Sequence, residues 1–132
     1  MKILFLCSSN IFRSQIAEAF FNHYTKSNLA ESAALIKPQE KMHALVVRAM
    51  KEIGIDISKN TSKKVTQDML DRADLLILMN PTLKEYVKED KLIEIWKIPD
   101  VVARETDEHL YPEFCKVRDI IEQKVKDLIK RI

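Results

Sequence analysis

Residues 5–20, FLCSSNIFRSQIAEAF, combine a cysteine, an arginine and a change of hydrophobic period within a few positions. The apolar run KILFL at residues 2–6 is typical of a fully buried strand, and from Ser14 onward Ile16 and Phe20 recur at helical spacing. Cys7 is therefore expected where a strand ends, and Arg13 where a helix begins. This strand, loop and helix start the pattern that decides the fold.

The same alternation continues to the end of the chain. We expect further strands at 29–35, 74–80 and 92–96, and helices at 42–53, 66–73 and 112–132, with Gly54 ending the second helix. Alternating strands and helices predict an α/β fold, a three-layer sandwich with a four-stranded parallel sheet and helices on both faces. We expect one domain, residues 1–132. Ligands of such folds bind beyond the carboxyl ends of the strands, where Cys7 is placed.

Composition excludes several classes of protein. Hydrophobic residues make up 46% of the chain and the net charge is only +2, so no bulk attraction to nucleic acid is expected. No apolar run approaches the length of a membrane helix, and the opening residues do not resemble a signal peptide. We therefore expect a cytoplasmic protein with no nucleic-acid or membrane partner, whose two cysteines are thiols rather than a disulfide.

Cys7 and Arg13 form a C-x5-R pattern around a loop that enters a helix. The five residues between them are Ser8, Ser9, Asn10, Ile11 and Phe12. The backbone N–H groups of such a loop can turn inward and bind an anion, and the arginine fork can hold two oxygens of a tetrahedral oxyanion. The same positive field favours a thiolate at the cysteine. The pattern thus predicts a nucleophile at the base of an oxyanion site.

CSSNIFRSQIAEAFF resembles the phosphate-binding loop of the low-molecular-weight protein tyrosine phosphatase family, a superfamily that includes the thioredoxin-coupled arsenate reductases. The resemblance extends over nearly the whole chain, through ADLLILMN, IWKIPDVV and YPEFCKVRDIIEQKVKDLI. It implies that Cys7 is the nucleophile, that Arg13 holds the phosphoryl oxygens, and that Asp100 is the general acid. Asp107 is the alternative acid in the same loop.

The resemblance also implies the substrate-binding residues. Asn10 would fix the loop, and Ser14 would hydrogen-bond the Cys7 sulfur. The backbone amides of the cradle would come from Ser8, Ser9, Asn10, Ile11, Phe12, Arg13 and Ser14.

The activity implied is that of a metal-independent cysteine phosphatase without a cofactor. It would hydrolyse phosphomonoesters, phosphotyrosine among them, through a phosphocysteine intermediate. The partners expected are a phosphorylated protein or a small phosphomonoester, with phosphate, vanadate or arsenate as ligands. Two alternatives stay open: an arsenate reductase that uses an external thiol, and an oxyanion-binding module without catalysis.

The sequence departs from the family pattern in two functional regions. The residues after Asp100 are Val101, Val102 and Ala103 instead of aromatic residues, so Phe12 and Trp96 are candidates for the wall around a substrate ring. The arsenate reductase branch places two resolving cysteines in the loop after the third strand, and here that loop is NPTLKEYVKEDK. The remaining cysteine, Cys115, is expected at the flank of the last helix, and His43 and His109 are expected to be solvated.

Overall fold

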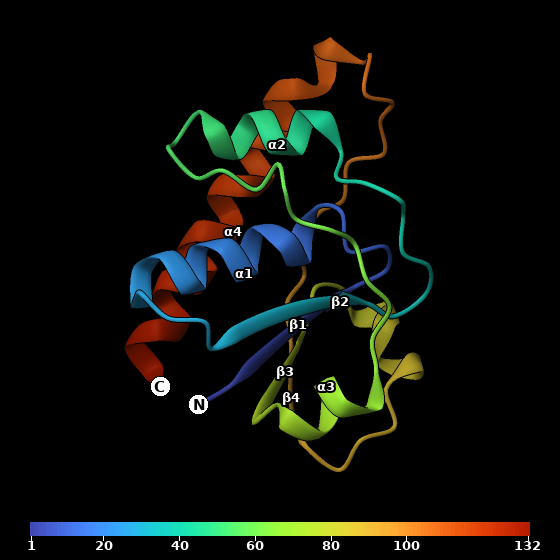
Figure 1. Ribbon diagram of the computed structural model, residues 1–132, viewed down its shortest axis with the longest axis vertical. Helices are drawn as coiled ribbons and strands as arrows, with labels where there is room; N and C mark the ends of the chain where they lie inside the picture. Colours follow the sequence, from blue (N-terminus) through green and yellow to red (C-terminus); the bar gives the residue numbers. More distant parts are fainter.

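The computed structural model describes residues 1–132, and its strands form one parallel sheet (Figure 1). The strands are β1 (Ile3–Cys7), β2 (Ala30–Ala34), β3 (Leu75–Leu78) and β4 (Leu92–Ile95), in the spatial order β2-β1-β3-β4. The first strand lies between β2 and β3 and pairs in parallel with both. The predicted four-stranded parallel sheet is confirmed.

Helices cover both faces of this sheet. They are α1 (Arg13–Thr25), α2 (Ala44–Lys51), α3 (Gln67–Arg72) and α4 (Tyr111–Arg131), with short 3₁₀ turns η1 (Pro81–Tyr86) and η2 (Glu108–Leu110). Figure 1 shows α1, α2 and α4 on one side of the sheet and α3 on the other. The three-layer arrangement is therefore also confirmed, although the η1 turn was not predicted.

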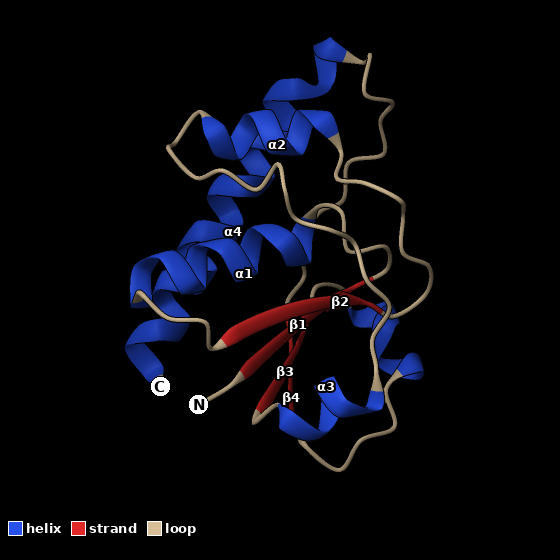
Figure 2. Cartoon of the chain, viewed as in Figure 1, coloured by secondary structure: helices blue, strands red, loops and turns tan.

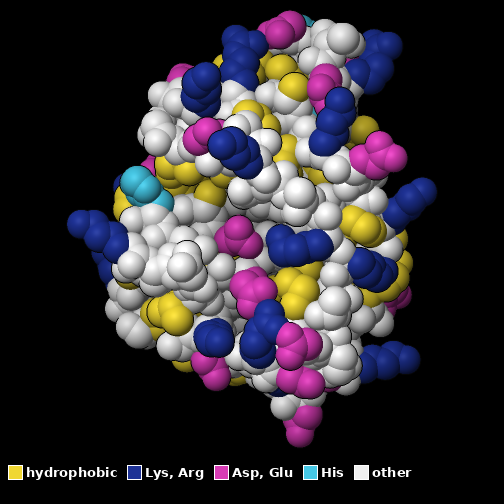
Figure 3. All heavy atoms as spheres, in the orientation of Figure 1, with side chains coloured by type: hydrophobic (Ala, Val, Ile, Leu, Met, Phe, Trp, Pro, Cys, Tyr) yellow, Lys and Arg dark blue, Asp and Glu magenta, His cyan; other side chains and the backbone are white.

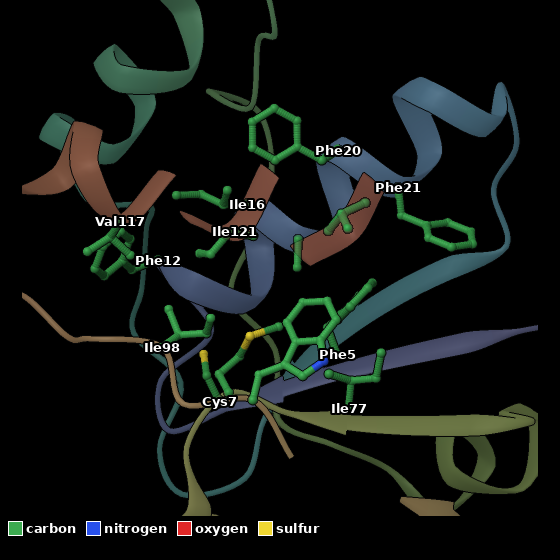
Figure 4. Packing of buried hydrophobic residues seen from close by; sticks show 14 of the residues in the cluster. Phe5, Cys7, Phe12, Ile16, Phe20, Phe21, Ile77, Ile98, Val117 and Ile121 are labelled. Atoms are coloured by element: carbon green, nitrogen blue, oxygen red, sulfur yellow. The ribbon is translucent and has the colours of Figure 1, made fainter. Parts of the chain in front are cut away.

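The strand β1 is buried on both faces, as its unbroken apolar sequence predicts. Successive side chains point to opposite faces, so Ile3, Phe5 and Cys7 join the larger hydrophobic cluster, and Leu4 and Leu6 join the smaller one. The larger cluster fills the space between the strands and α1, where Figure 4 shows Phe5, Phe20 and Phe21. The alternation of side chains along β1 therefore places Cys7, the last residue of the strand, in the main core.

Three apolar or aromatic side chains at helix ends are exposed, although they continue the helical spacing of the core residues. Tyr24 is 40% exposed at the end of α1, Ile53 is 40% exposed beyond α2, and Ile132 is 50% exposed at the chain end. Each lies in or beyond the last turn of its helix, where the helix has already passed the core. Helical spacing alone does not locate the point at which the partner surface stops.

The charged surface is mixed on the face seen in Figure 3. Lys and Arg side chains are spread over it with Asp and Glu among them, so no single basic surface forms there. None of the helices combines the length and the apolar character that crossing a membrane requires.

The end of α2 is set by Gly54, as predicted. Gly54 has φ +86°, and its N–H donates to the Lys51 carbonyl while the Ile55 N–H donates to the Met50 carbonyl. These two bonds form the Schellman ending, whose left-handed residue glycine adopts without strain.

Gly54→Ala is expected to lower the free energy of unfolding by about 1 kcal/mol, because an L side chain disfavours the left-handed conformation. No atom lies within 4 Å of the added Cβ, so this cost is conformational and not a clash. Gly54→Asn should lose less, since Asn tolerates this conformation. Urea unfolding measures both, and an alanine variant as stable as the wild type would contradict the assignment.

Candidate active site

The loop after β1 lies at the point where the chain changes direction across the sheet. From β1 the chain crosses through α1 to β2 on one side, and β3 pairs with β1 on the other side. Parallel sheets bind ligands at this switch point, beyond the carboxyl ends of the strands. Figure 2 shows that connecting loops gather at this end of the sheet. The predicted position of the C-x5-R loop is therefore a natural ligand site of the fold.

Asn10 holds the loop in its folded shape. Its backbone adopts the left-handed conformation with φ 58°, and the residue is fully buried. Its side-chain Nδ2 donates to Ser14 Oγ at 2.8 Å and to Ser32 Oγ at 2.9 Å. Asn is among the few L residues that adopt this conformation readily, and both amide hydrogens are used.

The other end of the Asn10 amide is equally engaged. Its Oδ1 accepts from the backbone N–H of Lys63 at 3.1 Å and from Gln15 Nε2 at 3.1 Å. Because the Lys63 N–H can only donate, this contact fixes which end of the amide is oxygen. Ser62 Oγ also donates to the Ser9 carbonyl at 2.7 Å, so segment 61–63 supports the loop from outside.

Cys7 is buried, with 3% of its surface exposed, and its sulfur contacts hydrogen-bond donors. The Asn10 backbone N–H donates to Sγ at 3.2 Å, and Ser14 Oγ lies 2.8 Å from Sγ. Since Ser14 Oγ already accepts from Asn10, its own hydrogen is free to donate to the sulfur. Both donors stabilise negative charge on Cys7.

Arg13 and Asp100 meet at the opposite side of the loop. Arg13 is buried, with 5% of its surface exposed; its Nη1 donates to the Ile98 carbonyl at 3.0 Å, and its Nη2 lies 3.7 Å from Asp100 Oδ2. The helix that Arg13 begins has no side-chain cap at Phe12, so its first-turn N–H groups remain available to an anion. The structure thus brings Arg13, Asp100 and Cys7 to one place.

A pocket of about 200 Å³ opens above Cys7. All the predicted substrate-binding residues except Ser14 line it, together with Asp100. Ser14 is buried beneath, against the sulfur. The side walls are apolar, with Phe12 packed edge-to-face on Phe114 at 4.9 Å between ring centroids.

Trp96 does not form part of this wall. It is 2% exposed, packs on Phe5 in the main core, and donates from Nε1 to Glu94. It was a candidate because the residues after Asp100 are not aromatic, but its side chain turns into the core. Phe114, at the first turn of α4, supplies the second ring beside Phe12 instead.

Asp107, the alternative acid, lies outside the pocket. Its carboxylate accepts from the backbone N–H and the guanidinium of Arg104, and these bonds, the backbone one foremost, hold the pKa of Asp107 below its ordinary value. Its role is to close a turn. Asp100, which faces Arg13, is the carboxyl group that the structure places at the site.

Two kinds of supporting residue were not predicted from the sequence. His43 was expected to be solvated, but it lines the pocket and bonds to Ala103. Ser32 and Gln15 fix the Asn10 amide, although they come from β2 and from the buried side of α1. A buried Ser in an apolar strand and a Gln on an inner helix face were the available signals, because buried polar groups need partners.

Glu18 completes the network behind the loop. Ser32 Oγ, which accepts from Asn10, donates to Glu18 Oε1 at 3.0 Å. Burial raises the pKa of the Glu18 carboxyl above its ordinary value, although nearby Lys63 and the Ser32 hydrogen bonds act in the opposite direction. Desolvation therefore outweighs the favourable contacts at this carboxylate.

Glu18→Gln tests this pKa shift. Between its ordinary and its raised pKa, Glu18 binds a proton in the folded chain and not in the unfolded chain, so the wild type loses stability as pH rises through this interval. The glutamine variant lacks this slope. Urea unfolding of both proteins between about pH 4 and 8 should therefore show their stability difference moving in favour of the variant as pH rises. A difference independent of pH would contradict the shift.

Known proteins share this fold. The family model described as low molecular weight phosphotyrosine protein phosphatase matches residues 2–132. An arsenate reductase from Brevibacillus brevis is 35% identical over 131 residues, which are 94% of this chain and 90% of the relative. The solved arsenate reductase from Archaeoglobus fulgidus is 30% identical with a TM-score of 0.76, and the alignment covers 98% of this chain and 99% of that one. The low molecular weight protein tyrosine phosphatase from T. tengcongensis has a TM-score of 0.86 at 24% identity, with 100% and 99% covered, and supports the fold alone. The chain belongs to the low molecular weight phosphotyrosine protein phosphatase family.

Proposed function

We propose that this chain hydrolyses phosphomonoesters through a phosphocysteine at Cys7. The observation that carries the proposal is the convergence of three groups on one pocket: the Cys7 sulfur with its two donors, the Arg13 guanidinium, and the Asp100 carboxyl. Hydrolysis needs these groups and water, and no second thiol at the site.

In the first step the Cys7 thiolate attacks phosphorus in line and forms a sulfur–phosphorus bond. The phosphorus–oxygen bond to the leaving group breaks, and the Asp100 carboxylic acid gives its proton to the departing oxygen. Arg13 and the uncapped N–H groups of α1 stabilise the charge on the three remaining oxygens. The products are phosphocysteine, a free alcohol or phenol, and an Asp100 carboxylate.

In the second step the Asp100 carboxylate takes a proton from water, and the water oxygen attacks phosphorus. The sulfur–phosphorus bond breaks, which releases inorganic phosphate and restores the thiolate and the carboxylic acid. The Ser14 hydroxyl, 2.8 Å from the sulfur, stabilises the departing thiolate. Inorganic phosphate and vanadate are then expected to bind as product-like ligands.

Arsenate reduction with an external thiol is the second candidate, and the names of the relatives favour it over phosphate-ester hydrolysis. The relative from Brevibacillus brevis is an arsenate reductase, as is the solved relative from Archaeoglobus fulgidus. The present chain has no second thiol in the pocket, because Cys115 lies on α4 beside Glu52. The two electrons that reduce arsenate must then come from an external thiol.

That reaction balances with two molecules of an external thiol, such as glutathione, or with one dithiol protein of the thioredoxin class. Cys7 would displace hydroxide from arsenate, with Asp100 protonating the departing oxygen. The first external thiol would attack the Cys7 sulfur and form a mixed disulfide, while arsenic leaves as arsenite and takes up the two electrons. The second thiol would reduce this disulfide and restore Cys7.

Cys7→Ser separates chemistry from binding. With p-nitrophenyl phosphate and no added metal, the wild type should turn over and the variant should lose activity by at least about 10⁴-fold, because a neutral hydroxyl replaces the thiolate. Vanadate binding, followed by calorimetry, should persist because the loop amides and Arg13 remain. Cys115→Ser is the matched control and should keep full activity. The parallel assay offers arsenate with glutathione or a thioredoxin system, and turnover there alone would favour the second candidate.

Asp100→Asn tests the general acid. Removing the proton donor should slow phenyl and alkyl phosphates by about 10²–10⁴-fold in kcat/KM, and p-nitrophenyl phosphate much less, because nitrophenolate leaves without a proton. The dependence of kcat/KM on leaving-group pKa should therefore steepen. Asp107→Asn is the control and should leave this dependence unchanged. If the two variants exchanged these behaviours, Asp107 would be the acid.

A further inference from the structure

His43 joins two parts of the site that the sequence separates. It caps the start of α2, where its Nδ1 accepts from the Leu45 N–H at 3.1 Å. Its Nε2 lies 2.8 Å from the carbonyl oxygen of Ala103, three residues after Asp100. One imidazole therefore contacts both the helix and the loop that carries the candidate acid.

The partners of His43 fix its tautomer. The Leu45 N–H can only donate, so Nδ1 is the acceptor and carries no hydrogen. The Ala103 carbonyl can only accept, so Nε2 carries the hydrogen and donates it. Both ring nitrogens are thus satisfied by the neutral imidazole, and a side chain with a single polar end could not make both contacts.

The loop after Ile98 has few other hydrogen bonds. Between Pro99 and Ala103, the bond from His43 is the only hydrogen bond that ties the backbone to another element. The Val101 N–H donates to the neighbouring Asp100 Oδ1, and the Asp100 side chain meets Arg13. Val101 and Ala103 pack against the main core, whereas Val102 is 90% exposed at the tip. The hydrogen bonds that direct this loop are therefore the one from His43 at one end and the Arg13–Ile98 bond at the other.

His43 is itself fixed by packing. Its ring lies 5.0 Å from the Phe114 ring, which in turn packs on Phe12, and His43 and both phenylalanines line the pocket. A rotation of the imidazole would open this apolar wall as well as release Ala103. The ring thus has one orientation that satisfies the helix, the loop and the wall together.

We propose that His43 is a positioning residue that holds the Asp100–Ala103 loop against α2 and so sets the distance between the acid and the oxyanion site. Its effect on catalysis rests on the proposed function, because it acts through Asp100. Its effect on the loop does not, because the hydrogen bond to Ala103 exists whatever the reaction.

Two variants separate the two ends of the imidazole. Asn has an oxygen near the place of Nδ1, so His43→Asn keeps a strong cap on α2 but cannot reach Ala103. Gln places an amide N–H near the place of Nε2, so His43→Gln can keep the bond to Ala103 but caps the helix poorly. If His43 acted only as the cap of α2, His43→Gln would impair the protein more than His43→Asn.

The test combines backbone ¹⁵N order parameters with leaving-group kinetics on the full chain. In His43→Asn, we expect the order parameters to fall over residues 100–104, because the Ala103 carbonyl loses its donor, while the midpoint of urea unfolding stays near that of the wild type. We also expect kcat/KM for phenyl phosphate to fall by about 10-fold and that for p-nitrophenyl phosphate by less than about 2-fold, a partial loss of the general-acid contribution. His43→Gln should unfold at lower urea and yet restore the wild-type order parameters of the loop and the wild-type leaving-group dependence.

The outcomes distinguish this proposal from the function on which it rests. If His43→Asn leaves the order parameters of the loop at their wild-type values, the loop does not depend on His43 and the proposal is wrong. If they fall but the leaving-group dependence of an active enzyme is unchanged, the positioning role in catalysis is wrong. If the wild type hydrolyses no phosphomonoester, the proposed function fails, and the order parameters alone then decide whether His43 positions the loop.

Discussion

The site depends on one buried amide, the side chain of Asn10. The turn from β1 into α1 requires a left-handed residue, and this loop contains no glycine to supply it. Asn10 adopts that conformation, and its amide bonds to Ser14, Ser32, Gln15 and the Lys63 backbone. A buried amide left without these partners would cost about 1–3 kcal/mol for each unmade bond, so the loop has one strongly preferred shape. The donors around Cys7 follow from that shape.

The uncapped start of α1 gives the shaped loop its preference for anions. Its first-turn N–H groups lack a side-chain partner, and Arg13 adds a buried positive charge beside them. Asp100 offsets part of this charge at 3.7 Å, and its side chain remains 47% exposed, as the proposed general acid requires. The apolar wall of Phe12 and Phe114 then decides what can approach. In the proposed function, oxyanion binding is thus local to the loop, whereas choice of substrate would depend on α2, α4 and the Asp100 loop.

The periodicity of apolar residues predicted the features of the fold that depend on neighbouring residues. The sheet, the helices and the meeting of Cys7 with Arg13 follow from apolar runs and from the order of elements, which neighbouring residues determine. His43 was misjudged and the place of Trp96 was left open because their roles depend on distant partners: Trp96 turns toward Phe5, and His43 reaches Ala103, 60 positions away. Asp100 was predicted as the acid and Asp107 as the alternative in the same loop, and their contacts with Arg13 and Arg104 show that only Asp100 lies at the pocket. Side-chain direction in loops is set by these contacts and has no periodic signal.

The most direct test of the account is to identify the group that Cys7 carries during turnover. The wild-type protein would be mixed with a phosphomonoester, quenched in acid within the first turnovers and mapped by peptide mass spectrometry. The account predicts one phosphoryl group on the peptide that contains Cys7 and none on the peptide that contains Cys115. A mixed disulfide at Cys7, formed only with arsenate and an external thiol, would keep the nucleophile but assign the reductase reaction. An unmodified Cys7 under both conditions, in a protein that turns over, would contradict the central claim that this thiol attacks the oxyanion.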